Sequence, residues 1–274
     1  MISLRAAVDD SGVAVSRREA ALLLAHLLGQ PREWVLAHPE AELTADQHQR
    51  FTNLIAQMQN GEPLPYLLGQ WEFFGLNFRL TPDALIPRPE TELLVETALA
   101  KIPNLKSQNP KIVDVGTGSG IIAVTLAVKL LQAEIFATDV SAAVLTVARA
   151  NAEMHRVADR ITFVQCDLLE GVGRVNLICA NLPYIPIAEL AALPVAKHEP
   201  TLALDGGPDG LLVIERLLAS ASDHLLPNGV LLAEIAAAQG PAALALAHHY
   251  SSPSARVKVH QDLAGLDRLV EIEL

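Results

Sequence analysis

The segment ANLPYI at residues 180–185 offers two hydrogen-bond acceptors suited to a planar amino group. It follows the apolar run VNLICA, which is typical of a strand, and Pro183 must end that strand because proline cannot donate to a sheet ladder. Asn181 supplies a side-chain carbonyl oxygen, and the rigid proline ring can fix the peptide carbonyl of Leu182 nearby. Acceptors held in this way match both hydrogens of an –NH2 group and would aim its nitrogen at an electrophile.

Tyr184 completes this segment. Its ring could stack on the planar amino group or line the path of a methyl-sulfonium cation. No strong base is then needed, because positioning supplies much of the acceleration and the proton can leave late. The alternative is purely structural, a proline-terminated strand with a turn Asn and a core Tyr. The residues described next favour the chemical interpretation.

A glycine-rich loop, DVGTGSG at residues 114–120, lies between an apolar strand and a helix. Its glycines allow a tight turn and close approach of a ligand, and the helix amino terminus behind them suits a carboxylate or phosphate. The G-x-G-x-G spacing differs from the G-x-G-x-x-G of dinucleotide folds, which argues against a nicotinamide-dependent dehydrogenase. The loop residues predicted to contact a ligand are Gly116, Thr117, Gly118, Ser119 and Gly120.

Two acids follow the next two strands of the same region. Asp139 ends EIFATD and could bridge the two ribose hydroxyls of an adenosine, or it could cap the following helix. Asp167, after ITFVQ, could accept from an adenine amino group, or it could be a loop acid. Because open α/β sheets bind ligands at the carboxyl ends of their strands, we expect these acids, the glycine loop and Asn181 at one edge.

Alternating strands and helices must position these groups. From residue 111 onward the pattern predicts strands in KIVDV, EIFATD, ITFVQCD, VNLICA and GVLLAEI, with helices at about 119–131, 141–156 and 240–250. Such alternation predicts a parallel sheet covered by helices on both faces. The last two apolar runs, ARVKVH and RLVEIEL, are separated by a short loop and predict an antiparallel hairpin at one edge.

The part of the chain before residue 91 has a different pattern. Residues 1–62 show only helical periodicity, with a helix over 16–29 and another over 44–61, each preceded by a capping residue, and predict a small helical domain. Residues 63–90 alternate around Gly75 and predict a connector that contains a hairpin. A helix over 90–101 follows, so we assign residues 91–274 to the catalytic domain.

Composition sets further bounds. The 274 residues are 51% hydrophobic and 19% charged, which indicates a globular chain. A net charge of −11 without a basic run disfavours nucleic acid as a partner. Cys166 and Cys179 lack CxxC spacing and are expected to be buried free thiols. We find no signal peptide and no apolar stretch of about 18 residues, so we expect a soluble cytoplasmic protein without membrane association.

The sequence resembles the PrmC/HemK family of peptide chain release factor glutamine methyltransferases. DVGTGSG, TD at 138–139, CD at 166–167 and NLPY at 181–184 are similar to class I S-adenosylmethionine-dependent methyltransferases that act on planar amino groups. Three further segments narrow the resemblance to this family and extend it over nearly the whole chain: GEPLPYLLGQWEFFGLNF at 61–78, LIPRPETELLVE at 85–96 and EPTLALDGGPDGL at 199–211.

The resemblance implies a Rossmann-like α/β fold, with a mostly parallel sheet and an antiparallel edge hairpin, after a small all-helical domain that helps to grip the release factor. It implies that residues 116–120, Asp139 and Asn181 hold S-adenosylmethionine, with Asp167 and Leu168 beside the adenine. It also implies that residues 181–184 receive the glutamine of the release factor's Gly-Gly-Gln loop. The family usually has NPPY, so Leu182 is a departure that bears on loop rigidity and substrate preference.

Several residues have weaker signals. Arg88, in IPRPE, could approach the methionine carboxylate of the cofactor or form a surface salt bridge, and Glu199, in KHEP, could shape the substrate entrance or belong to a turn. His248 and His249 lie near a helix end and are most simply solvated. The nine histidines show no HExxH or clustered spacing, so we predict no metal.

Two other functions remain open on the residues alone. The same acceptor segment would suit an amino methyltransferase acting on adenine or guanine in nucleic acid. A salt-sensitive affinity for RNA or DNA would support this function. A non-catalytic binding module that kept the fold would bind the release factor without turnover.

Overall fold

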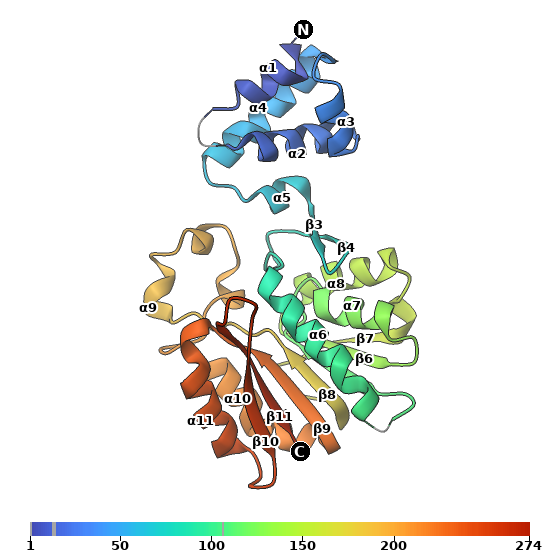
Figure 1. Cartoon of the computed structure of the whole chain (residues 1–274), viewed down its shortest axis with the longest axis vertical. Helices are drawn as coiled ribbons and strands as arrows, with labels where there is room; N and C mark the ends of the chain where they lie inside the picture. The colour runs from blue at the N-terminus through green and yellow to red at the C-terminus, as the bar shows by residue number, and fades with distance from the viewer. Residues whose placement is uncertain (1, 13–14, 106) are drawn as a thin grey trace. The chain divides into compact units, whose positions relative to one another are not determined.

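The computed structural model describes residues 2–12, 15–105 and 107–274 and divides the chain into two compact units, Met1–Gln70 and Trp71–Leu274 (Figure 1). The division falls inside the segment 63–90 that the sequence predicts as a connector. Residues up to Gln70 belong to the first unit, and the remainder of that segment belongs to the second.

The first unit is mainly helical. Ser16 and Thr44 each begin a helix with a reciprocal capping box, formed with Glu19 and Gln47. Gly29 ends the first of these helices in the left-handed conformation. The elements are β1 (Ile2–Ser3), α1 (Leu4–Asp9), α2 (Arg17–Leu28), α3 (Arg32–Ala37), β2 (Glu42–Leu43), α4 (Ala45–Gln59) and α5 (Leu64–Leu68).

Three features of this unit differ from the prediction. β1 and β2 pair as a short antiparallel ladder, which helical periodicity alone does not indicate. Helix α4 ends at Gln59 with Asn60 as its cap, before the predicted end at Gly61. Helix α5 occupies residues predicted as the start of the connector.

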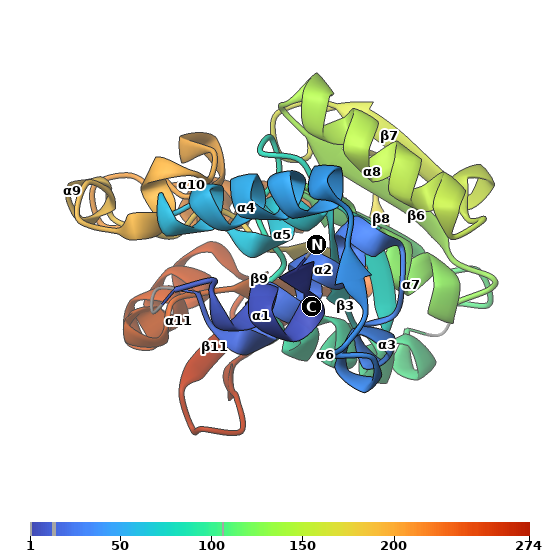
Figure 2. The ribbon, with the colours of Figure 1, turned by 90° about the horizontal axis from the view of Figure 1, so that it is seen from above.

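The second unit contains the predicted sheet, with seven strands in the order β10-β11-β9-β8-β5-β6-β7 (Figures 1 and 2). β5 to β9 are paired in parallel, and β11 joins β9 antiparallel with β10 at the edge, so the edge hairpin is confirmed. The strands are β5 (Lys111–Val115), β6 (Glu134–Asp139), β7 (Ile161–Gln165), β8 (Val175–Ala180), β9 (Leu225–Glu234), β10 (Arg256–Gln261) and β11 (Asp267–Glu273).

Helices cover both faces of this sheet, as Figures 1 and 2 show. Alternate residues of a strand enter separate cores: Ile112 packs with α6 and α7, whereas Val113 packs with α10 and α11. The helices are α6 (Glu92–Lys101), α7 (Ile121–Lys129), α8 (Ala142–Met154), α9 (Ile187–Leu190), α10 (Leu212–His224) and α11 (Gly240–Tyr250). Of these, α9 and α10 are not predicted by the sequence analysis.

Short elements complete the second unit. The hairpin predicted around Gly75 consists of β3 (Gln70–Phe73) and β4 (Leu76–Arg79), and this prediction is confirmed. The 3-10 turns are η1 (Pro89–Thr91), η2 (Ile102–Asn104), η3 (Ala158–Arg160), η4 (Pro194–Lys197), η5 (Thr201–Ala203) and η6 (Ala237–Gln239). Cys179 is buried and Cys166 is half-buried, and both are free thiols. Among the described residues, no helix has the length and apolar character needed to cross a bilayer.

Candidate active site

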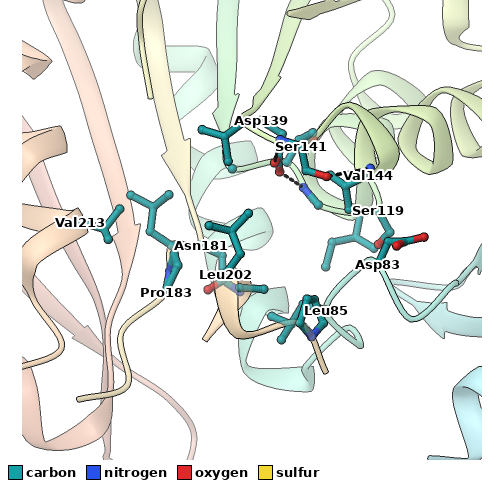
Figure 3. A pocket seen from close by; sticks show the side chains of 18 of the residues that line it. Asp83, Leu85, Ser119, Asp139, Ser141, Val144, Asn181, Pro183, Leu202 and Val213 are labelled. Carbon is teal, nitrogen blue, oxygen red and sulfur yellow. Dashed lines mark hydrogen bonds between the residues drawn. The ribbon is translucent and has the colours of Figure 1, made fainter. Parts of the chain in front are cut away.

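A cavity of about 660 Å³ opens at the carboxyl ends of β5, β6 and β8. Because β6 and β8 both pair with β5, the glycine loop, Asp139 and Asn181 meet there although they are far apart in sequence. In the view of Figure 3, Asp139 lies at one end of the cavity and Leu85 at the other, with Asn181 and Leu202 between them. The other walls come from the segments 82–88 and 200–205.

The glycine loop has two kinds of neighbour. A side chain on Gly116, which has a φ of +68°, would come within 2.9 Å of Leu182, so this glycine allows the loop to pack against the NLPY segment. Gly120 caps α7, and a side chain there would meet Ala148 of α8 at 3.1 Å. Four of the five predicted loop residues line the cavity, whereas Gly120 supports the loop from behind.

Asp114 fixes the glycine loop by hydrogen bonds from beneath the cavity lining. Its buried carboxylate accepts hydrogen bonds from the Thr117 hydroxyl at 2.6 Å and from the Ala123 amide at 3.0 Å. Burial raises the pKa of Asp114 from 3.8 to about 7, although both hydrogen bonds act in the opposite direction. A second support is Asn151 of α8, whose amide donates to the carbonyl oxygens of Ser119 and Arg79 and so ties the loop to β4.

The raised pKa of Asp114 predicts a pH-dependent stability. The folded chain holds a proton on this carboxyl between pH 3.8 and about 7, whereas the unfolded chain releases it. The contribution of Asp114 to stability is therefore complete below pH 3.8 and is lost as the pH rises towards 7, by at most about 1.4 kcal/mol for each pH unit. We expect Asp114→Asn to gain stability relative to the parent chain as the pH rises from 5 to 7.5.

Urea unfolding of both chains at several pH values in this range checks the expectation. The asparagine keeps one acceptor oxygen for Thr117 and Ala123 but carries no charge. Glu234, whose pKa burial also raises to about 7, is present in both chains, so its effect cancels in the difference. A stability difference that does not change with pH would contradict the assignment.

Asp139 ends β6, and its carboxylate connects the glycine loop to the start of α8 by two hydrogen bonds. Its Oδ2 accepts from the Gly118 amide at 3.1 Å, and its Oδ1 accepts from the Ser141 amide at 2.9 Å. Ser141, not Asp139, is the N-cap of α8. Burial raises the pKa of Asp139. Each carboxylate oxygen can accept further hydrogen bonds, so a pair of ligand hydroxyls fits this group.

Asp167 and Leu168 lie along the same edge. The Asp167 carboxylate accepts a hydrogen bond of 2.5 Å from the guanidinium of Arg216, a residue of α10 that also lines the cavity. Leu168 has a positive φ of 49°, and its carbonyl oxygen accepts from the Thr138 hydroxyl at 2.9 Å. Sequence reasoning missed Arg216, because α10 carries no motif that marks it.

The NLPY segment divides into two parts. Asn181, Leu182 and Pro183 line the cavity, and the Asn181 amide nitrogen donates to the Thr91 hydroxyl at 2.9 Å. Tyr184 is not among the lining residues. Its ring packs against the core beside α10 and α11, its hydroxyl donates to Glu234 at 3.2 Å, and its carbonyl oxygen accepts from Gln239.

Arg88 and Glu199 form a half-buried ion pair. The Arg88 guanidinium donates to Glu199 at 2.6 Å, and the second carboxylate oxygen accepts from the Ile86 amide at 3.1 Å. Glu199 itself is buried, so the pair fastens the segment 82–88 to the wall formed by residues 200–205. His248 and His249 are exposed at the end of α11. Within the part of the chain that the structure describes, no cluster of three His, Cys, Asp or Glu side chains could hold a metal ion.

Family models match both parts of the chain. A model described as PrmC N-terminal domain matches residues 3–69, and one described as Ribosomal protein L11 methyltransferase (PrmA) matches residues 93–206.

Two curated bacterial proteins, each named release factor glutamine methyltransferase, are similar over almost the whole length. The protein of Moorella thermoacetica is 43% identical over 260 residues, which are 94% of this chain and 91% of its own. The protein of Bordetella pertussis is 40% identical over 273 residues, which are 98% of each. Among solved structures, the hMettl16 catalytic domain in complex with MAT2A 3'UTR hairpin 6 gives a TM-score of 0.57 at 15% identity, over 83% of this chain and 81% of that chain, a similarity of fold alone.

Proposed function

Since the chain belongs to the family of release factor glutamine methyltransferases, we propose that it methylates the side-chain amide nitrogen of the glutamine in the Gly-Gly-Gln motif of peptide chain release factors. The methyl donor in this proposal is S-adenosylmethionine. The second unit has the fold of class I methyltransferases, and the chain is an enzyme of that type.

One observation supports the proposal most directly. The side-chain nitrogen of Asn181 donates a hydrogen bond to the Thr91 hydroxyl, so the side-chain oxygen is the atom left for a ligand. Asn181 lines the same cavity as the glycine loop and Asp139. An oxygen acceptor there suits the N–H groups of a primary amide.

The residues of the cavity fit an adenosine derivative. A Cβ atom added to Gly118 would meet only the Gly116 carbonyl oxygen, at 4.0 Å, so the space next to the loop is open to a ligand. Asp139 offers two oxygens for the ribose hydroxyls, and Asp167, Leu168 and Arg216 lie where the base would extend. We propose that residues 116–119, Asp139, Asp167 and Leu168 hold the cofactor, with Gly120 in a supporting position.

The chemistry required of the protein is mainly positioning. When bound, S-adenosylmethionine supplies an electrophilic methyl group on a positively charged sulfur. The Asn181 side-chain oxygen and the Leu182 peptide carbonyl would each accept one N–H of the glutamine amide, which fixes the amide plane and aims the nitrogen lone pair, perpendicular to that plane, at the methyl group. The nitrogen gains the methyl carbon as the carbon–sulfur bond breaks, which leaves a neutral thioether, and the nitrogen loses one proton to water.

Tyr184 does not act as the base in this proposal. Burial, together with the neighbouring Glu234 carboxyl, raises the pKa of Tyr184 above its ordinary value, so its hydroxyl stays protonated. Its contacts to Glu234 and Gln239 instead fix the chain directly after Pro183. We therefore place Tyr184 behind the acceptor segment, as support for its backbone.

The helical unit has a separate proposed role. We propose that residues up to about 62 contribute to gripping the release factor, as the match to the PrmC N-terminal domain favours. A cytoplasmic location, in which the enzyme meets its protein substrate, belongs to the same proposal.

The test is direct. The purified chain is incubated with labelled S-adenosylmethionine and a bacterial release factor, and the Gly-Gly-Gln peptide is examined by mass spectrometry. One added methyl on the glutamine amide supports the proposal. Cofactor binding without methylation of the release factor would reject it and direct the search to adenine or guanine in RNA and DNA.

A further inference from the structure

Behind the acceptor segment, buried hydroxyl and carboxyl groups connect to Asn181. Thr91 is completely buried, and its hydroxyl oxygen accepts from the Asn181 amide nitrogen at 2.9 Å. Glu234 is the last residue of β9, and it follows Ala233, which pairs with Ala180 just before Asn181. The strand register thus brings Glu234 to the same end of the sheet as Asn181, where Glu234 is only 2% exposed.

The Glu234 carboxyl is a neighbour of the Thr91 hydroxyl. Burial raises the pKa of Glu234, and the Thr91 and Tyr184 hydroxyls act in the opposite direction. The Tyr184 hydroxyl donates to Oε1, and Oε2 is buried with no hydrogen-bond partner among the described residues. A carboxylate oxygen is therefore available to Thr91.

This arrangement determines which way the Asn181 amide faces. A hydroxyl has one proton to donate. When that proton points to the Glu234 carboxylate, the Thr91 oxygen can only accept, and it selects the NH2 end of Asn181. Without the carboxylate, Thr91 could donate to the Asn181 oxygen, the amide could flip, and its NH2 group would then face the N–H groups of the substrate.

We propose that Thr91 and Glu234 are positioning residues that hold the Asn181 amide with its oxygen towards the acceptor amide. The proposal rests on the proposed function for its effect on catalysis, but the amide orientation is a property of the protein alone. The Thr91 hydroxyl is not needed to begin helix α6, because it makes no capping hydrogen bond there.

The charge state of Glu234 sets the condition for the test. Burial raises the pKa of Glu234 to about 7, with a smaller contribution from Glu90, although Thr91, Tyr184 and Arg268 act in the opposite direction. Because the proposed arrangement needs the carboxylate, the experiment is done at pH 8.

The experiment compares Thr91→Val, which keeps the shape and removes the hydroxyl, with Thr91→Ser, which keeps the hydroxyl. Thr125→Val is the matched control, because Thr125 is also completely buried and its hydroxyl has no partner among the described residues. We expect Thr91→Val to lower kcat for release-factor methylation by about 10- to 100-fold at unchanged affinity for S-adenosylmethionine. Thr91→Ser and Thr125→Val should stay within about threefold of the parent chain.

A second measurement does not depend on activity. The side-chain amide protons of Asn181, assigned by their absence in Asn181→Ala, should exchange with water at least about tenfold faster in Thr91→Val than in the parent chain. They should not change in Thr125→Val. Unchanged exchange in Thr91→Val would overturn the proposal, as would an unchanged kcat or a failure of serine to restore it. If the parent chain methylates no release factor, the proposed function fails while the exchange rates still decide the orientation of the amide.

Discussion

Replacing Asn181 with alanine is expected to lower kcat for release-factor methylation by about 100- to 1000-fold. The substitution removes an acceptor that is bound most strongly when the glutamine nitrogen is aligned for attack, so the loss should appear in kcat. Affinity for S-adenosylmethionine should change little, because the predicted cofactor contacts of the glycine loop and Asp139 remain.

Initial rates with a purified release factor, together with calorimetric titration of the cofactor, separate these effects. The variant also removes the donor to Thr91, so its melting temperature is measured alongside to show that the second unit is folded. Turnover equal to that of the parent chain would rule out Asn181 as the acceptor. A parallel loss of cofactor affinity would assign Asn181 to cofactor binding instead.

The second large effect is expected at Asp139. Asp139→Ala should raise the Kd for S-adenosylmethionine by about 100-fold or more, since it removes two hydrogen bonds to a charged group, each worth about 1.5–3 kcal/mol. The carboxylate also accepts from the Gly118 and Ser141 amides, so its loss loosens the glycine loop as well. At saturating cofactor, kcat should recover to within a few-fold of the parent value.

Alanine is a better choice than asparagine here, because an amide NH2 would face a backbone N–H at one of the two contacts. Asp159→Ala, an exposed acid on η3, is the matched control and should bind the cofactor normally. An unaltered Kd in Asp139→Ala would show that this carboxylate does not hold the ribose.

Much of the fold could be predicted because its signals are local. Capping residues placed the starts of α2 and α4, and the alternation of apolar strands and helices indicated the parallel sheet. The short loop between the last two strands indicated their antiparallel pairing. Each of these features depends on residues close together in the chain.

The elements that were missed lack such signals. β1 and β2 are two-residue strands whose pairing joins Ile2 to Leu43, and no periodicity exists over so short a run. Helix α5 has five residues and lies directly after Pro63, so the segment has turn-forming character as well as apolar character. Helix α10 is amphipathic, but it directly follows the segment DGGPDGL at 205–211, whose glycines and proline are typical of a turn and obscure the start of the helical pattern.

The site was predictable only where residues face the cavity. Asn181, Asp139 and the glycine loop each follow a strand, and the rule for parallel sheets gathers strand ends at one edge. The residues behind them could not be found in this way. Thr91 and Glu234 come from sequence positions far from Asn181, and their relevance depends on which side-chain atoms meet after folding.

The position of β11 has a consequence for how the second unit folds. β11 follows β10 in the chain but lies between β10 and β9 in the sheet, so β10 joins the sheet only by pairing with β11. The turn at residues 262–266 is held by Asp262, whose side chain accepts from Ala264, Leu266 and Arg268. Hairpins of this kind close in about 1–10 μs, whereas pairing with a distant strand such as β9 carries a larger loop-closure cost and is slower. We therefore expect the two strands to associate first and to add to the growing sheet as one preassembled ribbon.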